Sequence, residues 1–349
     1  MTLLEIEDLK TYYRTEDGYV HAVDGVSLTV EENETLGLVG ESGSGKTTIA
    51  ESINGILPDN AEIVEGSVTY DGVDLTDIPD KQLRKYRWND VSLIPQSAMN
   101  AFDPVYTIEE QIVEVIRAHK SDVSKAEAKE RARELFEFVD LDPERVGDYP
   151  HQFSGGMRQR AAIAMALALD PPIVLADEPT TALDVIIQDQ ILERIKELQS
   201  EIDSSMVMIT HDISVVSETC DKIAVVYGGR VVEYADTESV ITDPHHPYTL
   251  GLRNAFPTIG EGDQELISIP GSPPELVDPD EGCRFADRCP FAEEECFEET
   301  PEPRAVEDGH IVECHRADEV EMLQAEASEK ETWYESEAGG TEDKEVADD

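Results

Sequence analysis

Residues 35–47 read TLGLVGESGSGKT, an apolar run followed at once by a loop of glycine and serine that ends in lysine and threonine. The loop from Gly40 to Thr47 matches the pattern G-x-x-x-x-G-K-[ST], and the run before it is typical of a buried strand. Glycines let successive backbone N–H groups point at one anion, and a helix that begins there presents its positive end to the same anion. The stretch predicts a phosphate-binding loop.

The last two residues of this loop have the most specific expected roles. Lys46 is expected to reach the β- and γ-phosphates of ATP, and the Thr47 hydroxyl to bind Mg²⁺. A glycine- and serine-rich surface turn is the alternative, but the apolar run before the loop and the helix-forming residues after it argue against a mere turn. Alone, the loop fits kinases, GTPases and helicases equally well. The expected ATP-binding residues of this segment are Gly40, Ser42, Gly43, Ser44, Gly45, Lys46, Thr47 and Thr48.

The order of patterns along the chain predicts an α/β fold, because short apolar runs alternate with helical periodicity over roughly the first 235 residues. Thr107 followed by Glu110, and Ser124 followed by Glu127, match capping boxes, so residues 104–141 are expected to form a helical insert between strands. The expected buried strands are residues 35–39, 91–95, 173–176, 206–210 and 223–226.

A second acidic element follows one of these strands. Residues 173–178 form an apolar run that ends in Asp177 and Glu178. Ligands of open α/β sheets sit at the carboxyl ends of strands, so Asp177 is expected to hold Mg²⁺ and Glu178 to orient or deprotonate the attacking water. A strand that simply ends in solvent-facing acids is the alternative, and the phosphate loop in the same chain argues against it.

A small-residue turn opens a helix at residues 153–160. Ser154, Gly155 and Gly156 leave bare N–H groups at the start of this helix, which suits a further phosphate. The chain thus has two predicted phosphate-binding surfaces, although a single ATP site needs only the loop from Gly40 to Thr47.

Here the sequence resembles the ATP-binding-cassette family, whose signature is typically Leu-Ser-Gly-Gly-Gln. Phe153 and Met157 stand at the two flanking positions, so the side-chain role of the glutamine has no counterpart. The resemblance implies a mixed α/β sheet with a helical signature subdomain. It also implies that two subunits face head to tail, with the signature of one closing on the ATP held by the other.

The same resemblance assigns three further polar residues. Gln96 is similar to the glutamine that touches Mg²⁺ and senses the transmembrane partner, Asp184 to the aspartate that communicates across the dimer, and His211 to the histidine that contacts the γ-phosphate and supports catalysis. Taken singly, Gln96 is only a polar strand end, and a lone histidine after a strand is unremarkable. Their order along the chain makes the resemblance specific.

An aromatic ring is expected to stack on the adenine, an undemanding contact for any flat side chain. Tyr13 is the residue that we assign, and Tyr12 and Tyr19 are the alternatives.

The composition is strongly acidic, with 78 Asp and Glu against 27 Lys and Arg and a formal net charge of -51. Such a charge disfavours binding to nucleic acid and to anionic lipid surfaces. The acidic excess runs through the whole chain, and about 1 M salt would screen it over roughly 3 Å. We therefore expect a protein from the cytoplasm of a halophilic archaeon, with a generally acidic mesophilic protein as the alternative.

Four of the five cysteines cluster near the C-terminus, at Cys283, Cys289, Cys296 and Cys314. In a reducing cytoplasm such a cluster is more typical of metal ligands than of disulfides. Zinc and an iron–sulfur cluster both remain possible, although the wide spacing argues against zinc. A mixed ligand set with His310 or His315, and four unrelated thiols, are further alternatives.

The segments around these cysteines resemble the C-terminal extension of oligopeptide/dipeptide permease ATPase subunits. The matching stretches are residues 246–249, 269–274, 282–285 and 288–290. The resemblance implies a [4Fe–4S] cluster on the four cysteines, a heterodimer with a second related ATPase, membrane permease subunits and an extracellular solute-binding protein. The expected domains are an ATPase domain over 1–243 with its helical subdomain at about 97–165, a small irregular cysteine-rich domain over 244–317, and a disordered acidic tail over 318–349.

Together these features predict the ATP-hydrolysing subunit of an importer of dipeptides or oligopeptides. No run of about 18 apolar residues and no signal peptide is evident, so a peripheral position on the cytoplasmic face of the membrane is expected. Alternatives are a homodimer, an importer of nickel or sugars, a soluble cassette ATPase without a permease, and an iron–sulfur redox protein with an incidental nucleotide site.

Overall fold

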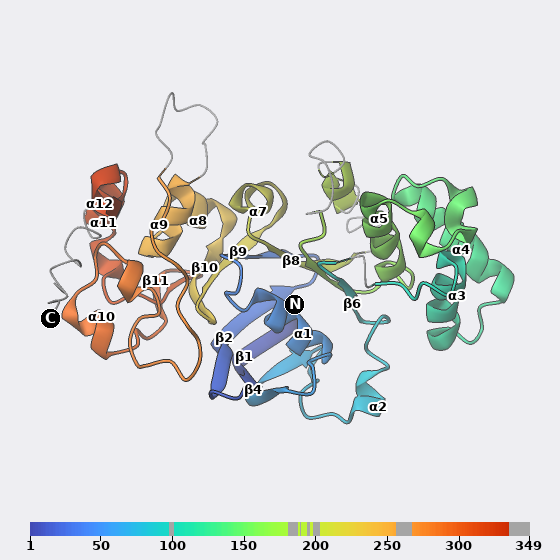
Figure 1. Ribbon diagram of the computed structural model, residues 1–349, viewed down its shortest axis with the longest axis horizontal. Coiled ribbons are helices and arrows are strands. Elements are labelled where there is room, and N and C mark those ends of the chain that lie inside the picture. Colours follow the sequence, from blue (N-terminus) through green and yellow to red (C-terminus); the bar gives the residue numbers. More distant parts are fainter. Residues whose placement is uncertain are drawn as a thin grey trace, which may run out of the picture.

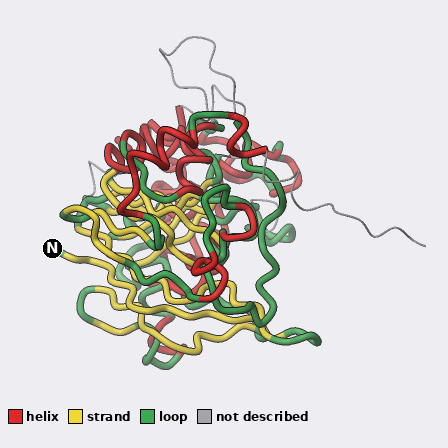
Figure 2. The backbone as a smooth tube through the Cα atoms, turned by 90° about the vertical axis from the view of Figure 1, so that its left-hand side faces the viewer, coloured by secondary structure: helices red, strands yellow, loops and turns green. Residues whose placement is uncertain are grey.

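The fold is built around the larger of two β-sheets. The computed structural model describes residues 1–97, 101–180, 188, 190–193, 196–197, 203–255 and 267–334. Within these residues the larger sheet has eight strands, in the order β11-β12-β10-β9-β3-β8-β7-β6. Seen from the end, the strands gather toward one side of the molecule and most helices lie on the other (Figure 2).

The centre of this sheet is parallel and buried. All five predicted strands are confirmed there, as β6 (Val91–Ile94), β7 (Ile173–Asp177), β8 (Ser205–Thr210), β3 (Thr35–Val39) and β9 (Lys222–Tyr227). Each pairs in parallel with its neighbour. Every residue of β3, β7 and β8 is buried, as expected when a parallel sheet is covered on both faces.

A smaller antiparallel sheet packs beside it. Its strands are β1 (Thr2–Arg14), β2 (Tyr19–Glu31), β4 (Ala61–Tyr70) and β5 (Val73–Asp74), in the order β2-β1-β4-β5. Helix α1 (Lys46–Asn54) contacts strands of both sheets, so the helix that follows the glycine-rich loop is held between them (Figure 1).

The helical insert lies between β6 and β7 and occupies the right of Figure 1. It comprises α3 (Ile108–His119), α4 (Lys125–Phe138), the turns Pro143–Gly147 and Pro150–Gln152, and α5 (Gly155–Ala166), while the short α2 (Asp80–Leu83) precedes β6. Both predicted capping boxes are confirmed, at Thr107 with Glu110 and at Ser124 with Glu127. The apolar faces of α3 and α4 belong to one buried core with α5.

Beyond β9 the chain turns back as β10 (Arg230–Asp236), which is antiparallel to β9. Helices α7 (Ile213–Thr219), α8 (Thr237–Thr242) and α9 (Pro247–Asn254) cover this end. No helix among the residues that the structure describes is long and apolar enough to cross a bilayer.

The C-terminal region is less separate than the sequence suggested. It contains the turn Ala286–Arg288, α10 (Glu294–Glu298), β11 (Arg304–Glu307) and β12 (His310–Val312). Strand β12 pairs with β10, Glu233 opposite Val312, so this region extends the main sheet. The hairpin covers the edge of β10, and the short β11 becomes the edge strand at this end of the sheet.

The prediction of a disordered tail from Asp318 is wrong as far as Tyr334. A turn at Ala317–Glu319 leads into α11 (Val320–Ala327) and α12 (Lys330–Tyr334). Leu323 and Trp333 are fully buried, and the Trp333 ring packs near Gly251 of α9. The many glutamates of this segment obscured its few apolar residues, which lie at helical spacing. Residues 335–349 lie outside the described residues.

Candidate functional site

The glycine-rich loop joins the buried end of β3 to the start of α1. Two of its glycines are required by close approach of other backbone segments. A Cβ at Gly40 would lie 2.0 Å from the carbonyl O of Val226, and one at Gly45 would lie 2.1 Å from the carbonyl O of Ala22. The loop is therefore pressed between β9 and β2, with its N–H groups at the start of α1.

The ammonium of Lys46 lies over this loop. Its Nζ donates to the carbonyl O of Gly40 at 2.8 Å, to that of Glu41 at 2.7 Å and to Ser44 Oγ at 3.1 Å. Burial lowers the pKa of Lys46 to about 8, although the nearby carboxylates of Glu178, Asp177 and Glu41 oppose the shift. A buried cation at a helix start is suited to bind phosphate.

The two expected Mg²⁺ ligands from distant segments meet at this point. Thr47 Oγ1 donates to Asp177 Oδ2 at 2.8 Å, across 130 positions of sequence. Burial raises the pKa of Asp177, and the hydrogen bond from Thr47 opposes that shift. Hydroxyl and carboxylate oxygens are ligands that Mg²⁺ prefers.

Glu178 and His211 also come together. The Nδ1 of His211 lies 3.2 Å from Glu178 Oε1. Glu178 has a φ of 46°, which is in the left-handed region that a glutamate rarely adopts. Its neighbours hold it there, since its N–H donates to the carbonyl O of Ile209 at 2.8 Å. Unusual backbone of this kind concentrates at functional sites.

Gln96 follows the neighbouring strand. Ile94 of β6 pairs with Ala176 of β7, so Gln96 lies just beyond the same sheet end as Asp177. Gln96 is exposed.

The signature segment lies in the helical insert, apart from α1 (Figure 1). Ser154 caps α5 by accepting a hydrogen bond from the Met157 N–H at 3.3 Å, and Ser154 and Gly155 are exposed. Phe153 is buried and packs edge-on against Phe136, with ring centroids 6.1 Å apart. Phe153 thus anchors this segment in the apolar core of the helical insert, while Ser154 and Gly155 lie at the surface.

Comparison with known proteins identifies the family. The ABC transporter family model matches residues 23–181, and the model of the oligopeptide/dipeptide transporter C-terminal region matches residues 232–296. A dipeptide transport ATP-binding protein of Lactococcus lactis is 46% identical over 301 residues, 86% of this chain and 86% of that protein. The chain belongs to the ABC transporter ATPase family.

Other similarities agree with this family. An oligopeptide transport ATP-binding protein of Bacillus subtilis is 44% identical over 314 residues, 89% of this chain and 87% of that protein. A solved dimeric ATP-binding cassette in a post-hydrolysis state, bound to ADP and Pi, aligns with a TM-score of 0.63 at 30% identity, covering 67% of this chain and 98% of that one. The α/β cassette fold and the ATPase activity expected from the sequence are those of the family.

Among the three tyrosines considered for adenine stacking, Tyr13 lies beside the loop of this ABC ATPase. Its hydroxyl is 3.1 Å from Thr48 Oγ1 and donates to Glu51 Oε2 at 3.2 Å, both on α1. Tyr12 instead stacks on His21, with centroids 3.8 Å apart, and Tyr19 is exposed at the start of β2. Asp184 lies outside the described residues.

The four clustered cysteines line one cavity, together with Phe285, Phe291, His246 and Arg316 among others. All are free thiols, and burial raises the pKa of Cys283 to about 12 and of Cys314 to about 11. Among the described residues, no group of three or more His, Cys, Asp or Glu side chains is arranged to hold a metal ion. The expected cofactor is therefore not shown by the structure.

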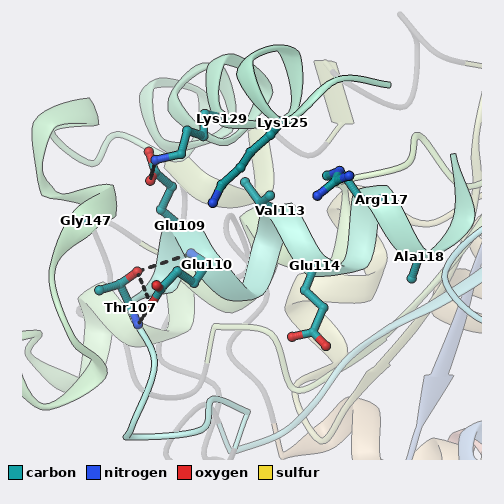
Figure 3. A pocket seen from close by; sticks show the side chains of 10 residues that line it. All are labelled: Thr107, Glu109, Glu110, Val113, Glu114, Arg117, Ala118, Lys125, Lys129 and Gly147. Atoms are coloured by element: carbon teal, nitrogen blue, oxygen red, sulfur yellow. Dashed lines mark hydrogen bonds and ion pairs between the residues drawn. The ribbon is translucent and has the colours of Figure 1, made fainter. Parts of the chain in front are cut away.

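A separate cavity of about 660 Å³ lies on the helical insert, between α3 and α4 (Figure 3). Lys129 points to Glu109 and forms an ion pair with it, and the Thr107 capping box closes one end. None of the expected nucleotide residues lines this cavity, so it has no part in the ATP site.

Sequence reasoning missed two residues that contact the phosphate loop from the C-terminal region. Arg288 pairs with the carboxylate of Glu41, and the Tyr248 hydroxyl accepts from the Glu41 N–H. Arg288 and Glu41 are 247 positions apart, and no local pattern marks such a pair.

Proposed function

We propose that this chain is the ATP-hydrolysing subunit of an importer that drives uptake of dipeptides or oligopeptides through a membrane permease. The observation that carries the ATPase part is the meeting of Thr47 with Asp177 beside Lys46. Similarity to dipeptide and oligopeptide transport proteins supports the peptide substrate. Uptake of nickel or sugars by the same machinery is the alternative.

In the proposed cycle Lys46 binds the phosphates, Thr47, Asp177 and Gln96 surround Mg²⁺, and Glu178 orients or deprotonates the attacking water with His211 nearby. Ser154, Gly155 and Gly156, of which the first two are exposed, close on the ATP of a second, related subunit, and Asp184 communicates between the two. Exposure of the signature segment supports such an arrangement.

The subunit is proposed to sit on the cytoplasmic face of the permease, with a solute-binding protein outside. We propose an ATPase domain at 1–243, including the helical subdomain at about 97–165, and an extension at 244–317. The match of residues 232–296 to the transporter C-terminal region supports this division.

Transport itself is the decisive test. The subunit is co-expressed with permease subunits of a peptide importer, and the complex is reconstituted in lipid vesicles. Labelled dipeptide, nickel or sugar is then supplied on the side of the membrane opposite the ATPase subunit, and ATP on the side of that subunit. ATP-dependent uptake of dipeptide, lost in Lys46→Ala, supports the proposal. Uptake of nickel or sugar alone contradicts the peptide part, and failure to co-purify with any membrane protein favours a soluble cassette.

We also propose that Cys283, Cys289, Cys296 and Cys314 hold a [4Fe–4S] cluster, with zinc as the alternative. Their shared cavity supports a common ligand. The sulfurs of Cys283, Cys289 and Cys314 each accept a hydrogen bond from the backbone N–H two residues later, and such bonds stabilise ligating thiolates.

Absorption spectroscopy and metal analysis after anaerobic purification distinguish these cofactors. Brown protein with about four irons per chain, lost in Cys296→Ser but kept in Cys220→Ser, is expected. Colourless protein that contains zinc would contradict the cluster.

The charge of -51 supports a salt-rich cytoplasm as the native environment. Because salt screens self-repulsion, the melting temperature should rise steadily as KCl is raised toward about 2 M. A melting temperature that is independent of KCl would contradict a halophilic origin.

A further inference from the structure

Glu41 is the first residue after Gly40 in the phosphate-binding loop, and its carboxylate forms an ion pair with the guanidinium of Arg288. Arg288 Nη1 donates to Glu41 Oε2 at 2.8 Å, and Nη2 donates to Oε1 at 2.9 Å. Two parallel bonds of this kind fix the orientation of both planar groups. The Arg288 side chain is 7% exposed and the Glu41 side chain 27%, so water reaches the pair mainly from the Glu41 side.

Arg288 is itself immobilised by other parts of the chain. Its Nε donates to the carbonyl O of Pro270 at 2.9 Å, and Nη1 also donates to the Tyr227 hydroxyl at 3.1 Å. The guanidinium lies over the rings of Tyr227 and Phe285, 5.6 and 6.0 Å from their centroids. A side chain held on so many sides can act as a fixed anchor for its partner.

The backbone of Glu41 links this anchor to the phosphate-binding lysine. The Glu41 N–H donates to the hydroxyl of the fully buried Tyr248 at 2.9 Å, while its carbonyl O accepts from Lys46 Nζ at 2.7 Å. Both Arg288 and Tyr248 belong to the region after the cassette strands. The contacts therefore run without a gap from the C-terminal extension through Glu41 to Lys46.

We propose that Arg288 is a positioning residue for nucleotide binding, which acts through Glu41 to hold the start of the phosphate loop in its binding conformation. A loop that is already ordered loses less conformational entropy when phosphate binds. The C-terminal extension is then a working part of the ATP site. This inference rests on the proposed role of the loop in binding ATP.

The test measures affinity for Mg–ADP by isothermal titration calorimetry on the full-length chain, with thermal unfolding recorded in parallel. Arg288→Met removes the guanidinium at similar volume, and Glu41→Gln removes the carboxylate charge but keeps the backbone. Arg304→Met is the matched control, because Arg304 is an arginine of the same region whose ion pair is with Asp318. Lys46→Ala reports whether the loop binds nucleotide at all.

We expect Arg288→Met and Glu41→Gln each to weaken ADP binding on the order of tenfold, with the combined variant no weaker than the worse single one. Arg288→Lys should bind ADP more tightly than Arg288→Met does, because lysine keeps the positive charge but cannot form the two parallel hydrogen bonds of the guanidinium. Hydrogen exchange of peptides that cover residues 40–47 should be faster in both single variants, and Arg304→Met should match the unchanged protein.

Affinity within about twofold of the unchanged protein in Arg288→Met and Glu41→Gln, alongside lost binding in Lys46→Ala, would overturn the inference and leave the ATP site standing. A lower melting temperature of Arg288→Met with unchanged affinity for ADP would also overturn the inference, since Arg288 would then contribute only to stability. If Arg288→Met does not fold, Glu41→Gln alone decides. Unchanged affinity in Lys46→Ala would overturn both the inference and the proposed ATP role of the loop.

Discussion

At the scale of single residues, the site depends on charges held where water is scarce. Asp177 is buried beneath Thr47, and Lys46 is buried against the loop carbonyls. Glu178 differs from them because its side chain is oriented by an unusual backbone angle and lies beside His211. A carboxylate so placed is suited to orient water, whereas Asp177 is suited to hold a cation.

Replacing Glu178, the proposed catalytic carboxylate, should separate nucleotide binding from hydrolysis. Glu178→Gln keeps the shape but cannot accept a proton, so ATP hydrolysis should fall at least about 100-fold while ATP stays bound. Single-turnover hydrolysis and nucleotide retention on the reconstituted complex measure the two effects. Glu134→Gln, at an exposed helix position, serves as the control. Hydrolysis at the usual rate in Glu178→Gln would remove Glu178 from the catalytic role.

The pH dependence of nucleotide binding should report on Lys46. Burial lowers the pKa of Lys46 from 10.5 to about 8, so the ammonium is fully present below about pH 7 and is lost as pH rises through 8. Because phosphate needs the charged form, affinity for Mg–ADP should fall by up to about tenfold per pH unit above pH 8. Titration calorimetry from pH 7 to 9.5 measures this slope. Lys46→Arg stays charged and should flatten the profile, and a flat profile in the unchanged protein would contradict the assignment.

At the scale of elements, the N-termini of several helices are stabilised by side chains that cap them. The capping boxes at Thr107 and Ser124 satisfy N–H groups that a helix cannot satisfy by itself. Ser154 does the same for α5, but Ser154 itself is exposed. Thr107 and Ser124 therefore serve as caps that contribute only to stability, and Ser154 is a cap that also belongs to the proposed dimer interface.

Removing the first of these caps should affect stability but not binding. Thr107→Ala should lower the free energy of unfolding by about 1 kcal/mol, because the N–H of Glu110 loses its acceptor. Chemical denaturation measures this change, with Ser121→Ala in the following loop as the control. Affinity for ADP should be unchanged. Equal stability of the two variants would mean that the box contributes nothing.

At the scale of the whole molecule, the C-terminal region and the cassette form one connected structure. Strand β12 extends the main sheet beside β10, and α11 and α12 pack near α9. The Arg288 and Tyr248 contacts join this region to the phosphate loop. Loss of packing at the C-terminal end is therefore expected to reduce stability.

Trp333 is the largest fully buried side chain of the molecule as described, and it lies in the segment that its composition marked as disordered. Trp333→Ala should destabilise the protein by about 3–5 kcal/mol, since the cavity left behind cannot fully collapse. Thermal and chemical unfolding measure the loss. Phe297→Ala, at a ring that is 54% exposed, is the control and should have little effect. If Trp333→Ala unfolds like the control, the helical packing of α12 is contradicted.

Much of the cassette could be predicted from sequence because its signals are local. The loop from Gly40 to Thr47, the five buried strands and the two capping boxes each depend on residues a few positions apart. The roles of Tyr13 and Gln96 stay predictions, because a single aromatic or polar residue carries no pattern of its own. The tail was misjudged because net charge outweighed sparse apolar spacing.

The sequence by itself determined the α/β class, the positions of the parallel strands and the position of the glycine-rich loop between β3 and α1, since steric limits, periodicity and glycine content act over short spans. Folding in three dimensions added what those spans cannot specify. It paired Thr47 with Asp177, joined β12 to β10, buried Trp333 and set Arg288 against Glu41. The reason is physical: contacts between distant segments depend on which apolar surfaces are buried together, and this burial is a property of the whole chain.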